Sequence, residues 1–372
     1  MAALMSRFIL STLVFIAACS ISTLATATNS LQIGMPATNS PDADQNPAYA
    51  TREDVMQAAD DIAQRLHLDD QWVRDAIGQA QYLPGVARLM LPAPVGTAKN
   101  WQRSRSRFVE PIRIRAGVRF WQENREALER AQQDYGVPPE IIIGILGVET
   151  VYGQQMGNFR VIDALATLAF DYPGAGARAQ ARSAYFKSEL GQFLLLASRT
   201  GTDPLQPLGS YAGAMGMPQF MPSNWTRFGV DFDGTGKVDL VNSAADAIGS
   251  VANYLYAFGW HTGMPATYPV SFDTARLNLS ALLAPDILPT FSVAGFLANG
   301  AVLQGAALQN PGPLALIELE NGDDGPSYVA GTENFYVITR YNHSSYYAMA
   351  VLDLGNAVAV AVAADEPNSP LP

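Results

Sequence analysis

The sequence predicts an α+β protein that is mainly helical. Apolar residues recur at helical spacing from Thr51 to about residue 258 and again near the C-terminus, whereas residues 265–332 are richer in Pro, Gly and β-branched residues. The chain has 372 residues, of which 48% are hydrophobic. This length and composition predict two or three packed units with buried cores.

The first residues have the pattern of a targeting segment. Arg7 precedes the apolar run "FILSTLVFIAAC", which is short for a membrane span. The run ends with small residues and Cys19, the only cysteine, as in a bacterial lipobox whose cysteine receives lipid after cleavage. We therefore expect a signal peptide at 1–18 and a lipid bilayer anchor at Cys19. An ordinary signal peptide cut after residues 25–27 is the alternative.

The anchor predicts a location and a spacer. Ser20 follows the cysteine, and this favours the outer membrane, with the protein facing the periplasm. Residues 19–50 are polar and lack periodicity, which predicts a flexible tether. A second flexible segment is expected at the tail, residues 363–372.

The first helical segments follow the tether. "TREDVMQAADDIAQRLHL" begins with Thr51 as a helix cap and acidic residues in the first turn. In "GVRFWQENREALERAQQDYG", Phe120, Leu128 and Ala131 form an apolar stripe, and Gly136 ends the helix. These segments predict helical structure over residues 51–135.

A buried helix is predicted next, and it carries one carboxylate. "PPEIIIGILGVETVYG" opens with prolines suited to a first helical turn and then has almost no polar face, which is typical of a buried helix. Glu149 lies at its C-terminal end, where burial and the helix dipole both raise the pKa of a carboxyl. A carboxyl that is protonated near neutral pH can serve as a general acid. A structural glutamate paired with a buried Arg or with backbone is the alternative.

The remaining elements are assigned by the same patterns. Helices are expected at 161–170, 181–199 and 243–258, and "YAMAVLDLGNAVAVAVA" predicts a helix that returns to the core. "LALIELENGDDGPSYVAG" predicts a strand, an Asp-Gly turn and a second strand. Residues 265–332 should therefore form a small mixed α/β unit.

A glycine-rich loop is the second candidate for function. In "GSYAGAMGMPQFMPSNW", Gly213 and Gly216 allow backbone to approach a ligand closely. Gln219 offers a donor and an acceptor that suit a sugar hydroxyl or amide, and Ser210 is suited similarly. The alternative is a tight loop leading into a helix, with Met side chains filling the core.

Four motifs in order resemble the membrane-bound lytic murein transglycosylase B family, over about residues 100 to 355. They are "GVETVYGQQMGNFRVIDALATLAFDYP", "GSYAGAMGMPQFMPSNW", "DAIGSVANYL" and "NFYVITRYN". The resemblance implies a lysozyme-like catalytic core at 136–264 plus 333–362. A helical N-terminal domain at 51–135 and a small sheet-containing domain at 265–332 would flank it.

The resemblance also implies an activity. Such enzymes cleave the β-1,4 bond between N-acetylmuramic acid and N-acetylglucosamine in peptidoglycan and leave 1,6-anhydro-muramoyl ends. Glu149 matches the catalytic acid and base, and the sugar's own C6 hydroxyl is the nucleophile, so one carboxylate suffices. Asp163 and Asp171 are the nearest candidates for a second carboxylate, although a structural role is favoured for Asp163. The alternatives are a muramidase that uses water and a wall-binding lipoprotein without turnover.

The resemblance implies further contacts with peptidoglycan glycan strands. The matching positions are Ser210, Gln219, Tyr254, Tyr341, Asn342 and Tyr347. Core packing is the alternative for Tyr254 and Tyr347. The family carries a tyrosine near Ser104 that this chain lacks, which places one wall of the sugar site in question.

Residues 231–246 resemble a calcium-binding EF-hand loop. Asp231, Asp233 and Thr235 alternate as ligands would, and Lys237 offers its carbonyl. Asn242 stands at the twelfth position instead of Glu, and Asp246 is expected to replace it, as a later aspartate does in the family's calcium loop. The alternative is an Asp/Gly-rich turn without metal. No cofactor is expected to be required; Ca²⁺ would be structural.

Charge and histidine content exclude other classes. The formal charge is −11, so the chain lacks the positive charge of a general nucleic-acid binder. The three His residues are scattered along the sequence, which argues against zinc. The oligomeric state is not determined by any of these patterns.

Overall fold

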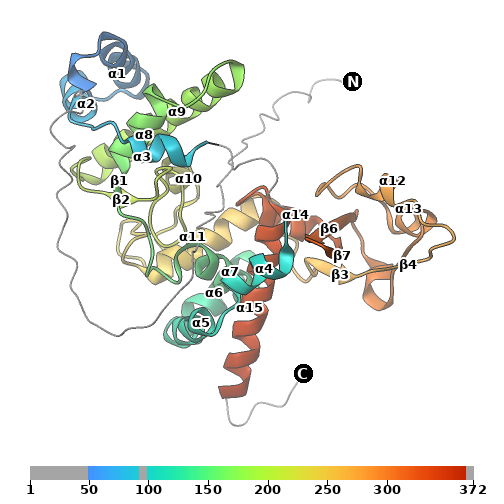
Figure 1. Ribbon diagram of the computed structural model, residues 1–372. Coiled ribbons are helices and arrows are strands. Elements are labelled where there is room, and N and C mark those ends of the chain that lie inside the picture. Colours follow the sequence, from blue (N-terminus) through green and yellow to red (C-terminus); the bar gives the residue numbers. More distant parts are fainter. Residues whose placement is uncertain (1–48, 92–98, 366–372) are drawn as a thin grey trace, which may run out of the picture.

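The computed structural model describes residues 49–91 and 99–365 (Figure 1). Helices dominate and a small antiparallel sheet lies at one side, so the predicted fold class is confirmed. The predicted signal peptide, Cys19 and nearly all of the tether lie outside the described residues.

One hydrophobic core is built from helices distant in sequence. Its aromatic and aliphatic centre includes Ile62, Leu165 and Phe193. The contributing elements are a 3₁₀ helix at Tyr49–Thr51, α1 (Glu53–Leu66), α2 (Asp70–Gly78), α3 (Pro84–Leu89), α8 (Val161–Phe170) and α9 (Ala177–Thr200). The helix predicted at 161–170 is present with those bounds. The predicted cap is wrong, because Thr51 belongs to the 3₁₀ helix and Arg52 is the N-cap of α1.

A second core holds most of the remaining helices. Ile142, Val251 and Leu354 are among its fully buried residues. Its elements are α4 (Trp101–Phe108), α5 (Pro111–Glu123), α6 (Arg125–Tyr135), α7 (Pro139–Thr150), α10 (Pro222–Phe228), α11 (Ala244–Ala257), α14 (Glu333–Thr339) and α15 (Ser345–Asp365). Trp225 of α10 packs against both cores.

The helices of the predicted domain at 51–135 do not share one core. α1 to α3 pack in the first core, whereas α4 to α6 pack in the second. The predicted stripe of Phe120, Leu128 and Ala131 is buried, but it spans two helices. Asn124 separates them, since its φ of −121° departs from helical geometry, and its side-chain amide donates to the Phe120 carbonyl.

α7 and α15 lie together at the centre of the second core (Figure 1). A Cβ at Gly144 of α7 would collide with the Val351 carbonyl of α15, so the two backbones touch at a residue without a side chain. α15 has the length and apolar composition of a membrane span, yet it packs on α4, α5 and α7. The predicted return helix is confirmed, and it continues to Asp365, so the start of the predicted tail at 363 is helical.

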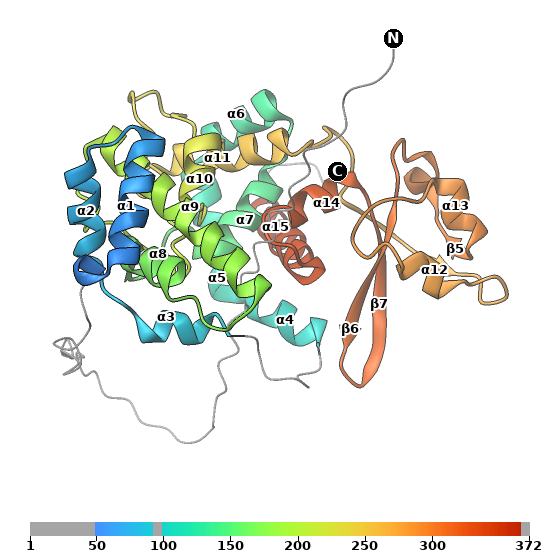
Figure 2. The ribbon, with the colours of Figure 1, turned by 90° about the horizontal axis from the view of Figure 1, so that it is seen from above.

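The small unit at 265–332 stands to one side of the helices, opposite α1 and α2 (Figures 1 and 2). Its three-stranded sheet has the order β3-β7-β6, and β4 pairs with β5. Its elements are β3 (Thr267–Pro269), β4 (Ser271–Phe272), α12 (Leu279–Leu283), α13 (Val293–Ala298), β5 (Ala301–Val302), a 3₁₀ helix at Gly305–Gln309, β6 (Ala315–Asn321) and β7 (Asp324–Gly331).

The predicted hairpin is present, with its turn two residues earlier than expected. Gly322 and Asp323 form the turn, and Gly322 has a φ of 70° that favours glycine. The N–H of Gly322 donates to the Lys99 carbonyl (3.1 Å), and the amide of Asn100 donates to the Asn321 carbonyl (3.0 Å). The hairpin tip is thereby tied to the start of α4.

Candidate active site

Glu149 lies one residue before the end of α7, at the edge of the second core. Pro139 is the first residue of this helix, as predicted, and Pro138 is its N-cap; the apolar residues of the helix are buried except for Val148, which is partly exposed. Glu149 itself is partly exposed. Desolvation raises the pKa of its carboxyl from 4.5 to about 7, and the hydrogen bond from Tyr347 lowers it in part. No arginine pairs with this carboxyl in the described part of the chain.

Tyr347, in the first turn of α15, holds the carboxyl in place. Its hydroxyl donates to Oε1 of Glu149 at 2.6 Å. Burial raises the pKa of Tyr347 well above its usual 10, so the hydroxyl keeps its proton. With Oε1 occupied as an acceptor, Oε2 is the oxygen available to carry the acidic proton.

Two further tyrosines, Tyr341 and Tyr254, pack in series next to Tyr347. Tyr341 stacks on Tyr347 with ring centroids 6.3 Å apart, and its hydroxyl donates to the Pro218 carbonyl at 2.6 Å. The ring of Tyr254 lies 4.8 Å from that of Tyr341, and its hydroxyl donates to the Arg340 carbonyl. Tyr254 is only 4% exposed. This burial favours the packing alternative for Tyr254.

The glycine-rich loop folds back on itself and presents two polar side chains. Ser210 Oγ accepts from the N–H groups of Ala212 and Ala214, which leaves its own proton free to donate. Gln219 has a φ of 51°, an unusual value for a residue with a side chain. Its Nε2 donates to the carbonyls of Met156 and Gly216, so Oε1 is the atom left for a ligand.

Asn342 is the least committed of the predicted contact residues. Its side chain is partly exposed, and its amide makes no hydrogen bond within residues 49–91 and 99–365. It lies next to Tyr341 and five residues before Tyr347. Both the donor and the acceptor of this amide are therefore available to a ligand.

The candidates for a second carboxylate are engaged elsewhere. Asp163 is 4% exposed and accepts two hydrogen bonds from Arg160, both at 2.7 Å. Asp171 accepts from Arg52 at 2.8 and 2.9 Å and from the Tyr49 hydroxyl. These ion pairs give both residues structural roles.

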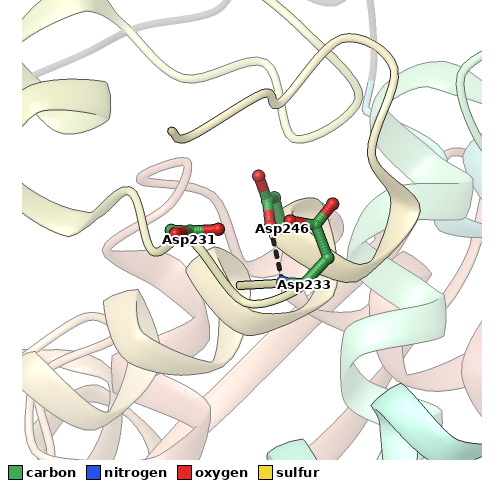
Figure 3. A group of neighbouring side chains, drawn as sticks. All are labelled: Asp231, Asp233 and Asp246. Atoms are coloured by element: carbon green, nitrogen blue, oxygen red, sulfur yellow. Dashed lines mark hydrogen bonds between the residues drawn. The ribbon is translucent and has the colours of Figure 1, made fainter. Parts of the chain in front are cut away.

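Three of the predicted metal ligands converge (Figure 3). Carboxylate oxygens of Asp231, Asp233 and Asp246 lie within 4.8 Å of one another. The Thr235 hydroxyl donates to the Lys237 carbonyl at 3.4 Å, so these two oxygens are neighbours as well. An all-oxygen set of this kind suits Ca²⁺.

Asp246 also organises the loop through the backbone. Its Oδ1 accepts from the N–H groups of Phe232 and Asp233, and its Oδ2 accepts from Asp239. This carboxyl is fully buried at the start of α11. Asn242, at the twelfth loop position, turns its amide to Asp239 and does not face the group.

A family match decides the class of this protein. The family described as the Transglycosylase SLT domain matches residues 51–356. The chain belongs to the transglycosylase SLT domain family. The match includes Glu149, the glycine-rich loop, the acidic loop and the tyrosine cluster.

Individual members of this transglycosylase family agree in sequence and in fold. The membrane-bound lytic murein transglycosylase B of Escherichia coli (strain K12) is 42% identical over 322 residues, covering 84% of each chain. The E. coli lytic transglycosylase Slt35 in complex with bulgecin A has a TM-score of 0.75 at 42% identity, covering 85% of this chain and 95% of that one. Slt35 in complex with calcium has a TM-score of 0.73 with the same coverage.

A more distant member of the family was solved with a cell-wall fragment. Pseudomonas aeruginosa SltB3, in complex with NAG-anhNAM-pentapeptide, has a TM-score of 0.67 at 28% identity. The match covers 82% of this chain and 79% of that one. The lysozyme-like lytic transglycosylase fold expected from the motifs is confirmed by these comparisons.

Sequence reasoning missed two contacts of this transglycosylase site. It assigned Tyr347 to the sugar or to the core, whereas its hydroxyl bonds Glu149. It assigned nothing to Thr150, whose hydroxyl donates to the Met217 carbonyl at 2.8 Å and so joins α7 to the glycine-rich loop. Neither pairing has a signal in the sequence, because the partners are 198 and 67 residues apart.

Proposed function

We propose that this lytic transglycosylase cleaves the β-1,4 bond between N-acetylmuramic acid and N-acetylglucosamine in peptidoglycan, with Glu149 acting first as acid and then as base. The observation that carries the proposal is the carboxyl of Glu149, whose pKa is raised to about 7 by burial while Tyr347 holds Oε1. A carboxyl in this state is protonated in a large fraction of molecules near neutral pH.

In the first step Glu149 gives its proton to the bridging oxygen. The bond from C1 of the muramoyl sugar to that oxygen breaks, and the N-acetylglucosamine unit leaves with a new hydroxyl. The positive charge at C1 is then shared by the ring oxygen and by the neighbouring N-acetyl group of the substrate. Glu149 is left as a carboxylate that still accepts from Tyr347.

In the second step the carboxylate takes the proton from the C6 hydroxyl of the same muramoyl sugar. The C6 oxygen bonds to C1, which forms the 1,6-anhydro ring and returns Glu149 to its protonated form. No water is consumed. A single carboxyl is enough for this sequence, which agrees with the ion pairs that occupy Asp163 and Asp171.

The proposed sugar contacts are the side chains with uncommitted atoms. Ser210 offers a hydroxyl proton, Gln219 offers Oε1, and Asn342 offers its whole amide. For Ca²⁺, Asp231, Asp233 and Asp246 with the oxygens of Thr235 and Lys237 form the proposed ligand set. The ion would brace the acidic loop. This role is structural, since among the described residues no carboxyl of the loop takes part in the hydrogen bonds of Glu149.

The proposed location is the outer membrane, with acylated Cys19 in the bilayer and the catalytic body in the periplasm. The lipobox pattern before Cys19 supports this location. Labelling with a radioactive fatty acid tests the acylation of Cys19: the wild-type protein should carry label, and the Cys19→Ala variant should carry none.

The chemical form of the product tests the reaction. Digestion of purified sacculi should release muropeptides whose muramoyl ends lack one water relative to the products of a muramidase, as measured by mass spectrometry. Reducing ends in place of anhydro ends would assign the protein to the hydrolytic alternative. Binding of sacculi without any soluble product would assign it to the wall-binding alternative.

A further inference from the structure

The two residues that follow α7 have an unusual backbone. Val151 and Tyr152 have φ values of 51° and 57°, in the left-handed region. A β-branched residue is strained there, and glycine is the usual occupant of this position after a helix. The turn comes directly after Glu149 and Thr150.

This left-handed turn closes the end of the catalytic helix. The N–H of Val151 donates to the Gly147 carbonyl at 3.2 Å, and the N–H of Tyr152 donates to the Leu146 carbonyl at 3.1 Å. The reversal also lets the N–H of Gly153 donate to Thr150 Oγ1 at 2.9 Å, while that hydroxyl donates to Met217. The left-handed turn therefore lies directly beside Glu149 and beside the contact that joins Thr150 to the glycine-rich loop.

The side chain of Tyr152 packs tightly between α5 and α7, next to this turn. Its ring stacks on Phe120 with centroids 5.2 Å apart, and it is 8% exposed. Its hydroxyl lies against α5 and α7 at Gly117 and Gly147, and a Cβ at either glycine would collide with it. That hydroxyl has no hydrogen-bond partner among the described residues. Shape, and not a hydrogen bond, keeps Tyr152 in place.

We infer that Tyr152 is a positioning residue for Glu149: its wedged ring holds the strained Val151–Tyr152 turn and so fixes the end of the helix that presents the acid. The inference rests on the proposed function of Glu149. The ring is needed because residue 151 is a valine, which is strained at positive φ. Glycine at 151 would adopt the left-handed conformation without help.

The test is a double-mutant cycle on soluble enzyme acting on purified glycan strands. Tyr152→Leu removes the wedge, and kcat should fall roughly 5- to 30-fold, which is the factor by which left-handed geometry is disfavoured for a residue with a side chain. KM should change little, because the proposed sugar contacts lie on other elements. Adding Val151→Gly to Tyr152→Leu should restore part of the lost kcat, because glycine relieves the strain at residue 151 while residue 152 keeps a side chain. Tyr152→Phe, which removes only the unpaired hydroxyl, is the matched control and should keep normal kcat.

A packing role alone predicts the opposite for the double variant. Val151 is 7% exposed, so its loss would add to the damage, and kcat would fall below that of Tyr152→Leu. That outcome overturns the inference, as does a normal kcat in Tyr152→Leu. If Tyr152→Leu does not fold, recovery of a folded, active protein in the double variant supports the inference. If neither variant folds, Tyr152→Met alone and Tyr152→Met with Val151→Gly replace them, and the same outcomes apply. Glu149→Gln separates the two hypotheses: normal lysis by that variant refutes the role of Glu149, whereas its inactivity beside a normal Tyr152→Leu refutes only the inference.

Discussion

Replacing Glu149 with Gln should abolish catalysis and, at the same time, stabilise the protein in alkaline solution. The pKa of this carboxyl is raised from 4.5 to about 7 in the folded protein. Between these pH values the folded chain keeps a proton that the unfolded chain has lost, so the free energy of unfolding decreases as pH rises through this window. A rise of this size corresponds to about 3 kcal/mol, since each unit of pKa is worth about 1.4 kcal/mol.

Glutamine has no charge to desolvate and still offers an oxygen to the Tyr347 hydroxyl. The variant should therefore match wild type near pH 4.5 and exceed it by about 3 kcal/mol above pH 7. Denaturant unfolding followed by tryptophan fluorescence at pH 5 and pH 8 measures this difference. Glu129→Gln, at an exposed position of α6, is the control and should show little change at either pH. A Glu149→Gln variant that is no more stable than wild type at pH 8, or that gains equally at both pH values, would refute the assignment of a desolvated acid.

The remaining predictions concern the residues near this carboxyl and the acidic loop at 231–246. Tyr347→Phe removes the hydrogen bond that lowers the pKa of Glu149. The alkaline limb of the pH profile of kcat/KM should therefore move to higher pH, and kcat should fall about tenfold. An alkaline limb that does not move contradicts this role of Tyr347. Asn342→Ala should raise KM roughly tenfold without changing the melting temperature, because its amide makes no bond in the described residues. Tyr254→Phe should leave KM unchanged and cost about 1–3 kcal/mol of stability, because the Arg340 carbonyl loses its donor. Calcium should raise the melting temperature of the wild-type protein, and at a calcium concentration about 100 times the dissociation constant the free energy of unfolding should increase by about 2.7 kcal/mol. The Asp233→Asn variant should lose this response, whereas the control Asp273→Asn, in the small unit, should keep it.

Elements governed by local patterns could be predicted from the sequence. The run of isoleucines after Pro139 predicted a buried helix, and α7 is buried as expected. α8 has the expected bounds, and Gly136 ends α6 as predicted; its conformation there is left-handed. In each case a few neighbouring residues determine the conformation.

Features that depend on distant partners could not be predicted in this way. The apolar faces of α4 and α5 pack on α15, more than two hundred residues later, so the helical pattern of residues 51–135 predicts one domain although these residues contribute to two cores. The loop pattern predicts Asp246 as a metal ligand, and this stays a prediction; the three backbone N–H groups that donate to its carboxylate are set by the folded loop and have no signal in the sequence. The positive φ of Val151 leaves no trace in composition or periodicity, because glycine and not valine is the usual signal of a left-handed residue after a helix.

The distance along the chain between Glu149 and Tyr347 has a consequence for when the enzyme becomes able to cut the wall. The two residues are separated by 198 positions, and the hydroxyl arrives only with the first turn of α15. A ribosome that has synthesised α7 has therefore not yet made the other half of the site, and fragments released before residue 347 carry an acid without its partner. Such fragments also lack α15, on which α4, α5 and α7 pack, so the acid and the helix that supports it are completed only with the last part of the chain.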